Sequence, residues 1–283
     1  MKNISLIKII WSVLIGLAVA TAPLVFHASA QSFEEFKQSR QQMLTEEAPD
    51  AEQAEFDAYK QNVRDEFEEY KQIVGEELKK YKQQILEKWE TAEVSTDKRW
   101  VQYSENYEDR RIVDFEQGFI ELDMIVDKTE SRSAIDRVID KKLADLIIED
   151  QKTAYERDQL AQNIEKQIKK KAKDVETDKV EAKPVLTKVI TGTDKPSEKQ
   201  VDKAVADLKQ KAAVTKKPAK KDDTKQVVSV KAPLPPDSIR KKAMEYEDEI
   251  KDYAGRRDLD TALVFAVIHT ESAFNPMARS HVP

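Results

Sequence analysis

The chain has 283 residues, of which 36% are charged, and it carries a formal net charge of −6. It contains only five glycines and no cysteine. The high charge favours long solvated helices over a compact α/β enzyme, and the length allows about two domains. The absence of cysteine excludes disulfides and thiol chemistry, and the acidic balance argues against a nucleic-acid partner.

Residues 1–30 are typical of a signal peptide. Lys2 and Lys8 form a basic start, an apolar core follows over residues 9–17, and Ala28-Ser29-Ala30 is a small-residue cleavage site before Gln31. The alternative is an uncleaved membrane anchor, because residues 9–26 are close to the minimum length of a membrane span. Pro23 and the cleavage site favour removal of the segment and export to the periplasm.

An eleven-residue repeat predicts one continuous helix from Glu55 to about Glu90. The repeated motif is Phe or Leu, two polar or small residues, and then Tyr-Lys-Gln. It occurs at residues 56–61, 67–72 and 78–83. This period keeps an apolar stripe on one helix face for about three repeats. The stripe is either a surface for a partner helix, a membrane interface or a glycan strand, or a face that packs on its own domain. We favour the second, and then expect Phe67→Asp to destabilise the protein by a few kcal/mol.

The rest of residues 31–232 predicts an α+β N-terminal domain that is rich in long helices and has a small β-hairpin or sheet. The polar gap at Gln117-Gly118 separates two segments of period two and indicates a hairpin over residues 111–126. The other predicted elements are a helix over 133–168, a strand over 185–190, a helix over 197–211, a lysine-rich mobile loop over 215–225 and a strand over 226–230.

A carboxylate follows the most apolar run of the C-terminal region. Residues 263–267 predict a buried helix, and Pro276 ends it by Asn275, because the residue before a proline avoids the α region. Glu271 then lies in the last turn, where burial and the negative end of the helix dipole both raise the pKa of a carboxyl group. A carboxylic acid that stays protonated near neutral pH can act as a general acid.

The segment Glu271-Ser-Ala-Phe-Asn-Pro276 resembles the catalytic signature of the lysozyme-like lytic transglycosylases. The last sixteen residues, together with residues 230–240, are most similar to the murein transglycosylase C subgroup. Residues 111–126 also resemble the N-terminal domain of that subgroup. The resemblance implies cleavage of the β-1,4 bond between N-acetylmuramic acid and N-acetylglucosamine, with Glu271 performing both proton transfers. Ser280 matches a substrate-contacting serine of the family, and its alternative is a simple turn residue.

The resemblance also defines what we expect around this site. It implies peptidoglycan strands as the partner, no nucleic acid, no metal and no cofactor; three histidines and no cysteine offer no plausible ligand set. His269 points to another helix face and is expected to be structural. Because members of the subgroup are anchored through an N-terminal cysteine, any outer-membrane or envelope association of this chain would lack a lipid anchor.

Residues 233–283 therefore predict the first helices of an all-α lysozyme-like domain, called the SLT domain in this family, that is incomplete. In the family, a Gly-Leu-Met-Gln segment that forms the floor of the glycan cleft follows the position of Pro283. About fifty residues are too few to bury a core, so we expect this chain to be truncated within its catalytic domain and inactive. The alternative function is a non-catalytic periplasmic module that binds the envelope.

Overall fold

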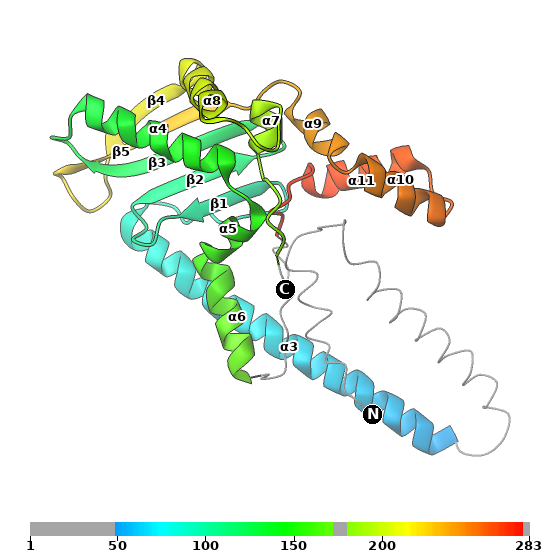
Figure 1. Cartoon of the computed structure of the whole chain (residues 1–283). Coiled ribbons are helices and arrows are strands. Elements are labelled where there is room, and N and C mark those ends of the chain that lie inside the picture. The colour runs from blue at the N-terminus through cyan, green and yellow to red at the C-terminus, as the bar shows by residue number, and fades with distance from the viewer. Residues whose placement is uncertain (1–48, 172–179, 280–283) are drawn as a thin grey trace.

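The computed structural model describes residues 49–171 and 180–279. The predicted signal peptide and Ser280 lie outside these ranges. The described residues form an antiparallel sheet with helices on both faces and three further helices at one end (Figure 1). The predicted mixed α+β class is confirmed.

The sheet of the described residues has five strands in the order β1-β2-β3-β5-β4. The strands are β1 (Arg99–Tyr103), β2 (Asp109–Asp114), β3 (Phe119–Asp127), β4 (Ala213–Pro218) and β5 (Lys225–Pro233). β2 and β3 form the predicted hairpin, with Val113 opposite Ile120. Gly118 closes its turn at φ 69°, in the left-handed region that favours glycine, and its N–H donates to the Asp114 carbonyl at 2.9 Å.

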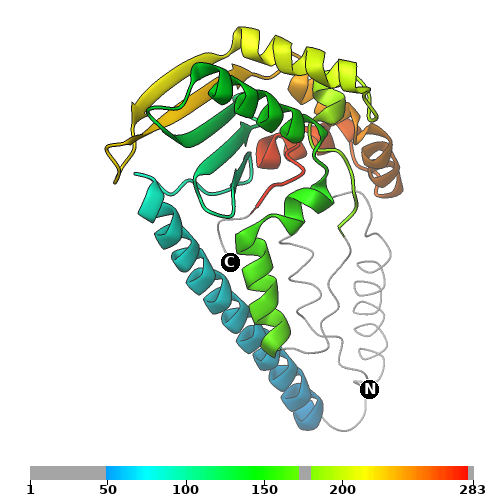
Figure 2. The ribbon, with the colours of Figure 1, turned by 60° about the vertical axis from the view of Figure 1, so that its left-hand side comes forward.

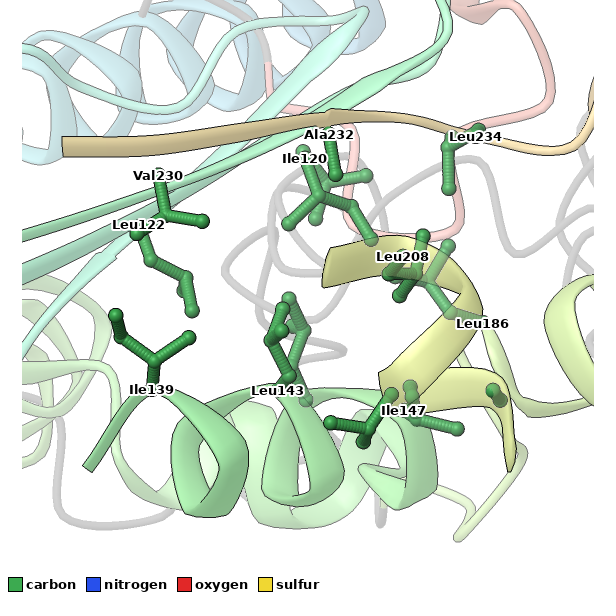
Figure 3. Packing of buried hydrophobic residues seen from close by; sticks show 14 of the residues in the cluster. Ile120, Leu122, Ile139, Leu143, Ile147, Leu186, Leu208, Val230, Ala232 and Leu234 are labelled. Atoms are coloured by element: carbon green, nitrogen blue, oxygen red, sulfur yellow. The ribbon is translucent and has the colours of Figure 1, made fainter. Parts of the chain in front are cut away.

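The main hydrophobic core lies on one face of the sheet, beneath α4 (Arg132–Ile148), α7 (Thr187–Thr191) and α8 (Glu198–Lys211). Figure 3 shows Leu143 of α4 and Leu208 of α8 on the side of Ile120 of β3. These three side chains are nearly inaccessible to solvent. The predicted helix over 197–211 is confirmed as α8, which buries the four apolar residues that its pattern indicated: Val201, Ala204, Val205 and Leu208.

The other face of the sheet is covered by the end of α3 (Pro49–Lys88), a continuous helix of 40 residues. Tyr81, Ile85 and Trp89, which lies just past its end, pack on residues of β1, β2 and β5. Farther from the sheet, α3 packs against α6 (Gln159–Lys171), as Figure 2 shows. The prediction of one long helix is therefore confirmed.

The aromatic stripe of α3 is buried only in part, contrary to the expectation that the whole stripe packs on the domain. Burial begins at Tyr70, whereas Phe56, Tyr59 and Phe67 are 47%, 59% and 37% exposed. Neither α6 nor the sheet covers this first part of the helix. The large destabilisation expected for Phe67→Asp is therefore not supported by the environment of Phe67.

The predicted helix over residues 133–168 is wrong as one element, because the chain breaks it into α4, α5 (Gln151–Glu156) and α6. Two aspartates start new helices at the breaks. Asp150 accepts a hydrogen bond from the Thr153 N–H at 2.8 Å, and Asp158 accepts one from the Ala161 N–H at 2.9 Å. Aspartate is favoured at such N-cap positions because it satisfies a free backbone donor.

Two predictions for the segment before β5 are also wrong. Residues 185–190 do not form a strand: the chain forms the short helix α7, which ends where Gly192 takes a φ of 81°. Short apolar runs do not by themselves separate strand from helix. The first four residues of the predicted lysine-rich loop, 215–218, belong to β4, an exposed edge strand that pairs with β5. Its lysines and Pro218 suit an edge, where they discourage pairing with another chain.

The C-terminal region contains α9 (Ser238–Met244), α10 (Glu247–Arg256) and α11 (Thr261–Ser272). Ile250, Ile268 and Phe274 form a small core between the last two helices. The helix predicted over residues 263–267 is present in α11. Its predicted burial is wrong, because Leu263 and Val267 are 57% and 52% exposed. Within the described ranges, no helix is long and apolar enough to cross a membrane.

Candidate active site

Glu271 lies in the last turn of α11, as predicted. Asp260 starts the helix by accepting a hydrogen bond from the Ala262 N–H at 2.8 Å. The helix ends at Ser272, and the next two residues, Ala273 and Phe274, both take left-handed conformations with φ of 49° and 59°. These conformations are uncommon for residues other than glycine. The chain therefore makes a sharp turn that begins two residues after Glu271.

An aromatic cluster fixes this turn. Phe274 is 4% exposed, and its ring lies 6.1–6.3 Å, between centroids, from the rings of Phe265, His269 and Tyr246. Contacts of this geometry add to the free energy gained by burying the ring. The burial of Phe274 offsets the cost of the two left-handed residues, and His269 contributes to the packing.

Asn275 connects the turn to the sheet domain. Its side-chain amide donates to the Asp97 carbonyl at 2.9 Å, and its side-chain oxygen accepts from the Met277 N–H at 2.9 Å. Farther along, Arg279 forms an ion pair with Asp158 at 2.6 Å. The residues that follow Glu271 are thus held against the segment before β1 and the start of α6.

The Glu271 carboxylate faces solvent, so the predicted burial of this residue is wrong. It shares a helix face with Leu263 and Val267, since residues four apart along a helix are neighbours. It is also close enough to Lys98 to affect that residue: the pKa of Lys98 is raised mainly by a hydrogen bond to Glu116 and in smaller part by the charge of Glu271. The site is an exposed acid at the end of an exposed apolar stripe.

Of the two predicted site residues, Glu271 and Ser280, the structure describes Glu271, and it adds the residues that anchor the turn after it. Ser280 lies outside the described residues, so its distance from Glu271 is not defined. Phe274 and Asn275 belonged to the sequence signature, but their roles as anchors of the turn came only from the structure. Among residues 49–171 and 180–279, no group of three or more His, Cys, Asp or Glu residues is arranged to hold a metal ion.

Comparisons with known proteins add no relative to this picture. No protein-family model matches the chain, and no curated protein matches it.

Proposed function

We propose that the protein belongs to the lysozyme-like lytic transglycosylases of the murein transglycosylase C type and acts on peptidoglycan in the periplasm. The proposal rests on the segment 271–276 and on its placement. A single carboxylate stands at a helix end, and the residues that follow it are fixed by the burial of Phe274 and the hydrogen bond from Asn275 to Asp97. In this proposal α9, α10 and α11 are the first helices of a lysozyme-like SLT domain.

The chemistry requires one acid that also acts as a base. Glu271 protonates the oxygen of N-acetylglucosamine as the bond from that oxygen to C1 of N-acetylmuramic acid breaks. The 6-hydroxyl of the same muramic acid then attacks C1 and closes a 1,6-anhydro ring, and Glu271 takes the hydroxyl proton. This scheme needs neither water nor the second carboxylate that most glycosidases use.

The observation that most supports this proposal is the packed turn after Glu271. Catalysis by a general acid requires that the acid be held in position against the bond that it protonates. Two left-handed residues in a packed turn fix the end of α11, so the position of Glu271 is set by the fold. The exposure of Glu271 in the described residues, however, leaves it without the water-excluding cleft that the reaction needs.

The test compares this chain with a version extended by a complete catalytic domain of the same family. We expect the extended protein to release 1,6-anhydromuropeptides from purified peptidoglycan, as measured by mass spectrometry, and the chain of 283 residues to release none. Glu271→Gln in the extended protein should abolish release, because it removes the transferable proton and keeps the shape. Asp248→Asn, an exposed carboxylate on α10, is the matched control and should retain activity. Full activity of Glu271→Gln would disprove the assignment of the acid.

A second candidate function is a non-catalytic module that binds the periplasmic envelope. The observation that favours it is the exposure of Glu271 beside Leu263 and Val267. Under this proposal the chain sediments with purified peptidoglycan, Glu271→Gln binds as well as the parent, and the extended protein releases no anhydromuropeptides. Activity of the extended protein that depends on Glu271 would exclude this candidate.

A further inference from the structure

A cavity of about 530 Å³ lies at one edge of the sheet, far along the chain from Glu271. Its walls come from the ends of β1 and β2 and from α4, α5 and α6. Sites for small molecules commonly have volumes of about 300–1,000 Å³. The cavity is large enough for a small molecule such as a short peptide. Its lining is strongly charged.

Two arginines of the cavity wall share one buried carboxylate. Arg111 and Arg157 both pair with Glu149, whose side chain is 1% exposed. Arg111 is held in place, since it also donates to the Gln102 side chain. Arg157 is 57% exposed, and its contact with Glu149 is long, at 3.4 Å. One carboxylate thus serves two guanidinium groups, and Arg157 can turn to a ligand at little cost.

The other cations of the wall are already neutralised. Arg110 is buried and bound to Asp123 at 2.6 Å. Lys142 pairs with Asp109 at 2.8 Å. Arg157 and Arg111 are therefore the cations of the wall that have only one directly paired carboxylate, Glu149, between them.

The rim of the same cavity carries acids that form no direct ion pair, although the charge of Asp145 offsets in small part the lowering of the Arg111 pKa by burial. Asp145 of α4 and Glu105 of the turn between β1 and β2 line the cavity and are exposed. Neither forms an ion pair or a side-chain hydrogen bond with any residue in the described ranges. An exposed guanidinium with one long ion-pair contact and two exposed carboxylates without ion pairs thus share one cavity. A phosphate dianion would be repelled by these acids, and a neutral sugar would leave both charges unused.

We propose that this cavity binds a small zwitterion, namely an amino acid or short peptide with both ends free. The ligand carboxylate pairs with Arg157 beside Arg111, and its ammonium group pairs with Asp145 and Glu105. Bidentate contact with a carboxylate is the geometry that a guanidinium favours. The exposed amide of Asn163, which also lines the cavity, can bind a peptide bond between the two ends. This proposal does not depend on catalysis by Glu271.

Calorimetric titration of the full chain with trialanine tests the proposal. We expect binding that weakens at least about tenfold when the peptide amine is acetylated, and by a similar factor when its carboxyl end is amidated, because each change removes one ion pair. Inorganic phosphate should bind more weakly than trialanine. No binding of trialanine at about 10 mM would overturn the proposal, as would equal binding of the capped peptides or of phosphate.

Two exposed residues allow the site to be tested without unfolding the protein. Arg157→Gln and Asp145→Asn should each weaken trialanine binding about tenfold or more, and the melting temperature should stay unchanged. The matched controls on α4, Arg137→Gln and Asp136→Asn, do not line the cavity and should bind like the parent. Equal loss of binding in the controls, or none in Arg157→Gln and Asp145→Asn, would overturn the assignment.

Discussion

The helices α4 and α11 are both rich in aliphatic residues, but they differ in how many of these residues are buried. α4 buries five of its residues, namely Ile135, Ile139, Leu143, Leu146 and Ile147. α11 is the more apolar sequence, and only Ile268 and Ser272 are buried. Apolar composition therefore does not determine burial; the layer that faces the helix does.

The physical reason lies in what each helix packs against. The residues of α4 recur at three- and four-residue steps and face the sheet, which supplies a second layer. α11 contacts α10 and the ring of Phe274 on one side, and the other side faces solvent among the described residues. The sheet body is therefore held by a shared core, whereas the C-terminal helices depend on a few contacts.

The largest difference between the two regions is expected in the free energy of unfolding that is lost when an ion pair is broken. Arg110→Met leaves the Asp123 carboxylate, which is 3% exposed, without its partner. Breaking a buried pair in this way costs about 3–5 kcal/mol. The matched change on α10, Arg256→Met, breaks an exposed pair with Asp252 and should cost less than about 1 kcal/mol. Urea denaturation measures both, and equal losses would show that the two regions are not held differently.

A smaller but cleaner contrast comes from the same substitution in α4 and α11. Leu143→Ala removes a side chain that is 1% exposed and should cost about 2–5 kcal/mol. Leu263→Ala removes one that is 57% exposed and should change the free energy of unfolding by less than about 0.5 kcal/mol. Thermal melts followed by circular dichroism compare the two variants. A large loss for Leu263→Ala would mean that the exposed face of α11 is covered in solution.

The sequence predicted those elements whose pattern is local. α3 and α8 followed from apolar periodicity, and the β2–β3 hairpin followed from Gly118 between two segments of period two. The breaks at Asp150 and Asp158 were missed because the apolar period of α4 continues into α6, so each aspartate could equally be a solvated helix residue. β4 was missed because its lysines show no alternation, and backbone pairing with β5 alone defines it.

The candidate site was predictable in position but not in environment. The place of Glu271 in the last turn followed from Pro276, whose effect on the backbone is local. Its burial depended on neighbours distant in sequence, and no local pattern reports these. The cavity beside Arg157 could not be predicted at all, because its lining comes from strands and helices spread over residues 102–163.

The contrast between covered and uncovered apolar residues also occurs within α3. Phe67 is 37% exposed, and its ring carries the ammonium group of Lys71 at 5.5 Å. Phe67→Asp loses this cation–π contact and little burial, so we expect a loss of no more than about 1 kcal/mol. Tyr81 lies on the same stripe about four turns closer to the sheet. Tyr81→Asp places a carboxylate where a side chain that is 8% exposed contacts Tyr103 and Tyr107. That variant should lose several kcal/mol. Equal melting temperatures of the two variants would contradict the division of α3 into a covered and an uncovered part, and a large loss for Phe67→Asp would indicate a partner on the exposed stripe.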